Sequence, residues 1–136
     1  MFNFFRSLFY KLPTIKSGNF LVLHGEQGSG KSTLARKIAA RRGKYAEIQS
    51  YDLNHTSALP AALADAPTTL IIEAEGFTRK GLEQLKILVT SKTITFRRPY
   101  TKQQETIPAP QVIVCTHDVE PFCDMRRAQL HLVRKA

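Results

Sequence analysis

Cysteine is scarce in this sequence, and long apolar runs are missing from it. The 136 residues include two cysteines, Cys115 and Cys123, which are too few for a disulfide scaffold and form no CxxC metal-binding pattern. No apolar run approaches the length of about eighteen residues that crosses a bilayer. We therefore expect a protein of the reducing cytoplasm, with no integral membrane association.

Acidic residues are also few. Eleven Asp and Glu stand against twenty Lys and Arg, which gives a formal net charge of +9 and a pI near 9.9. This charge suits a polyanionic partner, and nucleic acid and nucleotides are the first candidates. The length fits one domain, and 43% apolar residues are enough to bury a core. Collagen, a long coiled coil and general disorder are thereby excluded.

The first residues differ from the rest of the chain. Apolar residues recur at helical spacing from Phe2 to Leu12, and Pro13 ends this pattern. We predict an amphipathic helix in residues 1–17 that packs on its own domain or on a neighbouring subunit, in preference to a membrane surface. Residues 18–136 are predicted to form the single main domain.

Strand and helix patterns alternate along the main domain. Strands are predicted at 20–24, 46–51, 68–74, 92–97, 111–116 and 129–133, with helices after residue 30 up to Gly43, within 57–66 and over 80–90. Such alternation is typical of an α/β fold. We expect a three-layer α/β/α domain with a mainly parallel sheet of about five strands.

A glycine-rich loop follows the first predicted strand. The segment GEQGSGKS fits G-x-x-x-x-G-K-[ST] at every fixed position, between a strand and a helix. Backbone N–H groups of such a loop face a phosphate, Lys31 reaches the outer phosphates and the Ser32 hydroxyl binds Mg²⁺. We therefore predict a P-loop that binds ATP with Mg²⁺. Its predicted binding residues are Gly25, Glu26, Gln27, Gly28, Ser29, Gly30, Lys31, Ser32 and Thr33.

Two carboxylates come at the end of the aliphatic strand LIIEAE. A P-loop enzyme needs carboxylates there to hold the Mg²⁺ water shell and to polarise the attacking water. Glu73 and Glu75 are two residues apart, so on a strand they face the same way. We assign metal coordination to Glu73, together with Ser32, and the general base to Glu75, although the two roles could be exchanged. One or both could also merely solvate the strand end.

The order of these motifs resembles the superfamily 3 helicases, which are AAA+ motors of small DNA viruses and plasmid replication initiators. The likeness extends over residues 18–134 and is carried by GEQGSGKS, LIIEAE, TITFRRPYTKQQETIP, QVIVCTH and MRRAQLHLV. It implies an ATPase that forms a homo-oligomeric ring, a hexamer, and translocates on single-stranded DNA or RNA in replication. A separate origin-binding or loading protein is an expected partner, and the host cytoplasm the expected location.

The resemblance also assigns a nucleic-acid contact. In this family a β-hairpin carries a basic residue into the central channel, and here the hairpin corresponds to 92–111 with its tip at 101–104. Lys102 is then the contact residue. The residues that would flank it on the strand are Arg97, Arg98 and Tyr100. A basic side chain beside an aromatic one also suits backbone tracking combined with base stacking.

Two further roles follow from the same resemblance. The family has a polar residue, usually asparagine, that reaches the γ-phosphate, and Thr116 and His117 occupy this position here. Arg126 and Arg127 match the arginine that enters the active site of the neighbouring subunit. The sequence departs from the family at His117 and at the carboxylates, which the family places side by side.

Two other functions remain open. A small P-loop nucleotide kinase would have a similar length, and the basic stretch 97–102 could serve as its lid. An AAA+ adaptor would use ATP mainly to order an assembly on DNA. The carboxylate pair after the third strand favours the motor, because a kinase has no use for it.

Overall fold

The computed structural model describes residues 12–54, 58–98 and 100–134. Most of the predicted N-terminal helix lies outside these residues. Residues 13–16 form neither helix nor strand and lead into a turn at Ser17 and Gly18. None of the helices in the described ranges is long and apolar enough to cross a membrane.

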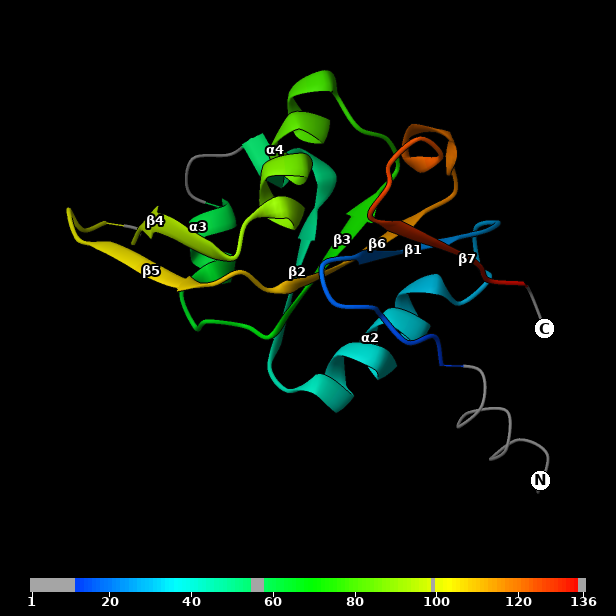
Figure 1. Cartoon of the computed structure of the whole chain (residues 1–136), viewed down its shortest axis with the longest axis horizontal. Helices are drawn as coiled ribbons and strands as arrows, with labels where there is room; N and C mark the ends of the chain where they lie inside the picture. The colour runs from blue at the N-terminus through cyan, green and yellow to red at the C-terminus, as the bar shows by residue number, and fades with distance from the viewer. Residues whose placement is uncertain (1–11, 55–57, 99, 135–136) are drawn as a thin grey trace.

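Five parallel strands form the central sheet, in the order β2-β3-β6-β1-β7. Their bounds are β1 Phe20–His24, β2 Tyr45–Gln49, β3 Thr69–Ala74, β6 Gln111–Thr116 and β7 Ala128–Leu132. Because all five run in one direction, the loops that leave their carboxyl ends gather at one edge of the sheet (Figure 1). The predicted α/β fold with a five-stranded parallel sheet is confirmed.

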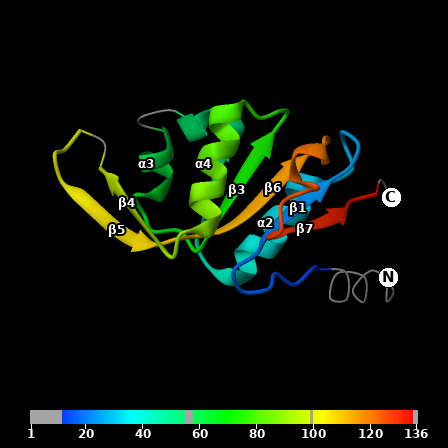
Figure 2. The same cartoon turned by 45° about the horizontal axis from the view of Figure 1, so that its top comes forward.

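Helices cover both faces of the sheet. They are α2 Lys31–Arg42, α3 Ala58–Leu63 and α4 Arg79–Thr90, with short 3₁₀ segments η1 Ser50–Asn54 and η2 Glu120–Phe122. Residues Leu21 and Leu23 of β1 pack with α2, whereas Phe20 and Val22 pack with α4 and η2. Figures 1 and 2 show α4 and α2 on opposite sides of the sheet. Burial on both faces explains why β1 is a continuous apolar run instead of an alternating one.

The predicted hairpin forms a separate two-stranded sheet. Strands β4 Thr93–Arg97 and β5 Gln104–Pro108 pair antiparallel, and Phe96 and Ile107 pack against Leu63 of α3. The hairpin projects from the α3 side of the domain, away from the C-terminal end of the chain (Figures 1 and 2). The tip was expected at 101–104, but Gln104 pairs with Arg97 within the ladder. The turn therefore precedes it, closed by a hydrogen bond from Arg98 N to Gln103 O of 3.1 Å.

The second strand is shorter than predicted. It begins at Tyr45 and ends at Gln49, and the η1 segment follows where strand was expected up to residue 51. The Asp52 carboxylate accepts a hydrogen bond from Gln49 N at 2.9 Å. This side chain satisfies a backbone donor that would otherwise continue the ladder, so the strand ends there.

Candidate nucleotide-binding site

The glycine-rich loop connects β1 to α2 at the carboxyl edge of the sheet. Gly28 and Gly30 have φ of 80° and 94°, a left-handed conformation that favours glycine. Gly30 is the N-cap of α2, and no side chain caps the helix there. The first N–H groups of an α-helix have no acceptor within the helix, so this end is suited to an anion.

The start of the loop lies against the end of β7. A Cβ atom on Gly25 would come within 2.3 Å of the Val133 carbonyl oxygen, and Val133 N donates a 2.7 Å hydrogen bond to His24 O. Only glycine allows this approach of two backbones. The beginning of the glycine-rich loop is thereby held in a fixed position.

Lys31 lies over the loop that precedes it. Its Nζ donates hydrogen bonds to Gly25 O at 2.9 Å and to Glu26 O at 2.8 Å. These bonds keep the ammonium group among the glycine-rich residues, at the N-terminus of α2. The geometry places one fixed positive charge at the centre of the loop.

A cleft of about 1540 Å³ opens at this edge of the sheet. Of the predicted site residues, it is lined by Gly25, Glu26, Gln27, Gly28, Gly30, Lys31, Ser32, Thr33, Glu73, Glu75 and His117. Its volume exceeds the roughly 300–1,000 Å³ of common ligand pockets. The loop and the ends of β3 and β6, far apart in the sequence, thus meet around one space that is large enough for a nucleotide.

Glu73 faces α2 from the central sheet. It stands in register between Gln49 of β2 and Cys115 of β6, and residues of this row pack on the α2 side. Its Oε1 atom is buried and has no hydrogen-bond partner within the described residues. A buried carboxylate oxygen without a protein partner costs free energy, and a cation or a water molecule bound there would satisfy it.

Glu75 does not lie on the strand, contrary to the prediction from the sequence. Strand β3 ends at Ala74, and Glu75 lies exposed in the bend that follows. The expectation that both carboxylates share one strand face is therefore wrong for Glu75. It nevertheless lines the same cleft as Glu73, because the bend keeps it at the carboxyl edge.

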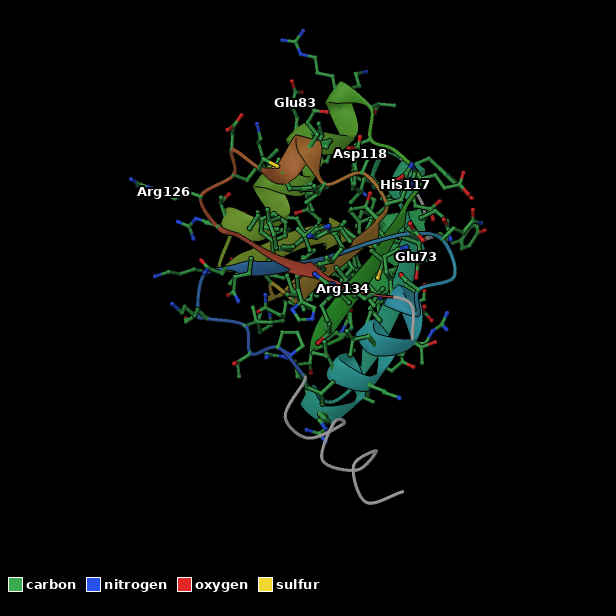
Figure 3. All side chains as sticks on the ribbon, turned by 90° about the vertical axis from the view of Figure 1, so that its right-hand side faces the viewer. Glu73, Glu83, His117, Asp118, Arg126 and Arg134 are labelled. Carbon is green, nitrogen blue, oxygen red and sulfur yellow. The ribbon has the colours of Figure 1, made fainter. Side chains whose placement is uncertain are left out.

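The end of β6 contributes His117 to the cleft. The hydroxyl of the preceding Thr116 is engaged by the next residues, since it accepts from Asp118 N and donates to Asp118 O, both at 3.1 Å. His117 itself is exposed on the cleft wall (Figure 3). These two bonds form a turn in which the side chain of His117 takes no part.

Cys115 is buried beside Glu73 and below Lys31. Its Sγ donates to Lys31 O at 3.8 Å. Burial raises the pKa of the thiol to about 12, and the negative charge of Glu73 contributes to the rise. Cys115 is therefore a packing residue below the loop.

Iodoacetamide is expected to alkylate Cys123 and to leave Cys115 unmodified in the folded protein. At a pKa of about 12, roughly one Cys115 thiol in 10⁴ is ionised at about pH 8. Cys123 is exposed. Mass spectrometry of the digested protein measures both sites, and labelling in urea, where both should react, is the control. Equal labelling of the two residues in the folded state would contradict this assignment.

The predicted arginine pair lies away from the cleft of its own chain. Arg126 and Arg127 precede β7, at the amino end of that strand. Figure 3 shows Arg126 on the opposite side of the molecule from Glu73 and His117. Both arginines are exposed, and Arg127 donates a hydrogen bond to Gly18 O at 3.1 Å, which holds it in its own chain.

The hairpin residues are also remote from the cleft. Lys102, Tyr100 and Arg97 are exposed on the projecting hairpin. Arg98 forms an ion pair with Glu105 at 2.8 Å and donates to Ala64 O at 3.4 Å, so it fastens the hairpin to the domain. Of the residues predicted to contact nucleic acid, Arg98 takes part in these bonds within the domain, whereas Lys102, Tyr100 and Arg97 are exposed on the hairpin.

Sequence reasoning missed the two ends of the cleft. At one end Arg36 of α2 forms a 3.0 Å ion pair with Glu47 of β2, and Gln49 and Asp52 complete the wall. At the other end lie His24 and Leu132, followed in the chain by the exposed Arg134. The strand order could have indicated these residues, because ligands of parallel sheets bind at the carboxyl ends of the strands. The sequence alone does not show which strands are neighbours.

Comparison with solved structures places the fold among known proteins. The chain is similar to the C-terminal region of NrS-1, with a TM-score of 0.67 and 17% identity over 89% of this chain and 30% of that one. It is similar to NtrX from Brucella abortus in complex with ATP, with a TM-score of 0.59 and 16% identity over 97% of this chain and 36% of that one. The chain thus spans about a third of the length of these structures. At such identities the likeness concerns the fold alone.

Comparison by sequence identifies the family. No curated protein matches the chain. Residues 7–125 match the virulence-associated protein E-like domain, which covers most of the sequence and includes the glycine-rich loop and the ends of β3 and β6. The chain therefore belongs to the virulence-associated protein E-like family.

Proposed function

We propose that this protein is a Mg²⁺-dependent ATPase that acts as an oligomeric motor on single-stranded nucleic acid, in the replication of a virus or mobile element. One observation carries the proposal: the uncapped N-terminus of α2, with Lys31, opens on the same cleft as the unpartnered Oε1 of Glu73. A phosphate site and a metal-binding carboxylate side by side are what phosphoryl transfer requires.

The phosphates would be bound by the loop. Left-handed glycines at 28 and 30 turn successive N–H groups toward one space, and the open end of α2 adds favourable potential. Lys31 would exchange its two carbonyl acceptors for the outer phosphates. ATP as the ligand is supported by the fold likeness to NtrX, whose structure contains ATP.

The residues of the cleft fit a Mg²⁺ ion. Five carboxylates line it, from Glu26, Glu47, Asp52, Glu73 and Glu75, against the fixed positive charges of Lys31 and Arg36. An ATP polyanion among them calls for a cation. No group of three His, Cys, Asp or Glu side chains in the described ranges could hold a metal alone, and Mg²⁺ commonly relies on one or two carboxylates plus substrate phosphates.

The chain's own residues would then divide the work of hydrolysis. Glu73 and Ser32 would hold Mg²⁺, which neutralises charge on the phosphates when bound. Glu75, which lines the cleft, would take a proton from the attacking water, and His117 would donate a hydrogen bond toward the γ-phosphate. Both assignments rest on the position of these residues around the loop.

The hairpin is the proposed contact with nucleic acid. It carries Arg97, Tyr100 and Lys102 exposed at its far end, so a phosphate and a base could be bound together. A subunit ring with the hairpins at its centre agrees with the position of Arg126 far from its own cleft.

ATPase rates with and without single-stranded DNA test this function. We expect ATP hydrolysis that requires Mg²⁺ and rises when single-stranded DNA is added, together with oligomers by mass photometry or negative-stain imaging. A monomer that consumes ATP only with a nucleoside monophosphate would establish a nucleotide kinase instead. ATP binding and DNA assembly without turnover would establish an adaptor.

Lys102→Ala is expected to weaken binding to single-stranded DNA while basal ATPase stays roughly intact. Loss of one phosphate contact per engaged subunit lowers the slope of log affinity against log salt by about 0.7. Fluorescence anisotropy with a labelled oligonucleotide at several salt concentrations measures both. Lys80→Ala is the matched control, because Lys80 is an exposed lysine of α4 outside the hairpin. An unchanged slope in the Lys102 variant would place the contact elsewhere.

A further inference from the structure

We propose that Leu132, with His24 beside it, forms the wall on which the base of the bound nucleotide packs. This inference rests on the proposed ATPase function and identifies a residue that the phosphate motif does not include. It concerns the end of the cleft at β7, which lies outside the glycine-rich loop and the carboxylate strand.

Leu132 is an exposed apolar residue at a polar site. It is the last residue of β7, it is 47% exposed and it lines the cleft. It stands in register with His24, the last residue of β1. Paired residues on parallel neighbours point to the same side of the sheet, which is the α4 side for His24 and Leu132, and both residues line the cleft at the strand ends.

The strand order sets the direction in which a nucleotide would lie. The carboxylates and His117 follow β3 and β6, which lie on one side of β1, and β7 lies on the other side. With the outer phosphate at Glu73, the phosphate chain crosses the loop that leaves β1. The sugar and base then extend toward β7, where Leu132 is the exposed apolar side chain on the cleft wall.

This wall is held in place. The backbone bond between Val133 N and His24 O of 2.7 Å joins the two strand ends, and the Val133 carbonyl lies against Gly25. Burial and the nearby His131 lower the pKa of His24, which favours the neutral imidazole as a flat contact surface. The proposed phosphate loop and the proposed base wall are thus joined at the same carboxyl edge of the sheet.

The expected effect is a loss of affinity for the base part of the ligand only. Removing the leucine side chain forfeits a small apolar contact area, which corresponds to roughly a three- to tenfold weaker Kd for ATP. Inorganic tripolyphosphate has no base, so its affinity is expected to stay unchanged. The ratio of the two affinities therefore isolates the base wall from the phosphate loop.

The matched control is Leu130. It lies two residues earlier on the same face of β7 and is 44% exposed, but it does not line the cleft. Leu132→Ser and Leu130→Ser thus remove equally exposed leucines from one strand. Leu132→Ala is a second, milder variant that keeps the test intact if the serine variant does not fold, as judged by circular dichroism.

Isothermal titration with ATP and with tripolyphosphate, both with Mg²⁺, provides the measurement. We expect Leu132→Ser to weaken the binding of ATP and to leave the binding of tripolyphosphate unchanged. Leu130→Ser should change the affinity for neither ligand. Equal weakening of both ligands, an unchanged ATP affinity, or equal effects of the two leucines would overturn the base wall. If the wild-type protein binds neither ligand, the proposed ATPase function itself fails, and the inference fails with it.

Discussion

Glu75→Gln is expected to bind ATP with near wild-type affinity and to hydrolyse it about 10² to 10⁴ times more slowly. Binding depends on the loop and Lys31, which this change does not touch, whereas a general base acts only in the chemical step. Because Glu75 is exposed beyond the end of β3, the substitution has no buried partner to disturb. Equilibrium binding of ATP and steady-state phosphate release measure the two effects separately.

Glu73→Gln is the companion that tests the division of roles. Its Oε1 is buried on the α2 side and has no hydrogen-bond partner among residues 12–54, 58–98 and 100–134, so the change should raise the Mg²⁺ concentration needed for half-maximal turnover. Glu83→Gln is the matched control, since Glu83 is exposed on α4, outside the cleft (Figure 3). If Glu73→Gln abolishes turnover at every Mg²⁺ concentration while Glu75→Gln remains active, the order of the two carboxylates is reversed.

The central strands could be predicted because their pattern is local. Strands β1 and β6 occur with the predicted bounds, since both are continuous apolar runs buried on both faces. The end of β2 could not be predicted, because it depends on the bond from Gln49 N to the Asp52 side chain. The hairpin turn differs from the prediction because the pairing of Arg97 with Gln104 depends on the register between β4 and β5, which the pattern of each strand alone does not determine.

The candidate site divides in the same way. The glycine-rich loop and Glu73 could be predicted from the sequence, because each belongs to a contiguous motif at the end of a buried strand. The cleft walls at Arg36 and Leu132 could not be predicted, because they depend on which strands lie at the two ends of the sheet. Parallel sheets bring strand ends together across long stretches of sequence, and only the topology shows which residues meet.

Arg126 is the candidate residue for the active site of a neighbouring subunit. It is exposed at the amino end of β7 and far from its own cleft, whereas Arg127 is bonded to Gly18 O. If Arg126 completes the site of a neighbouring subunit, Arg126→Ala should bind ATP normally and lose about 10³- to 10⁵-fold in turnover. Arg127→Ala, the matched control, should instead lower the melting temperature, because it loosens the 17–19 turn.

Mixing two inactive variants tests the assignment directly. Lys31→Ala removes the charge over the phosphate loop and should abolish turnover, yet it retains Arg126. In a ring assembled from equal amounts of Lys31→Ala and Arg126→Ala, about a quarter of the interfaces join an intact loop to an intact arginine. The mixture should therefore recover up to about that fraction of the wild-type rate, measured as phosphate release after co-assembly. Co-assembled rings that stay inactive would remove Arg126 from the mechanism, and proteins that do not co-assemble would argue against the ring itself, because a monomer leaves each defect in its own site.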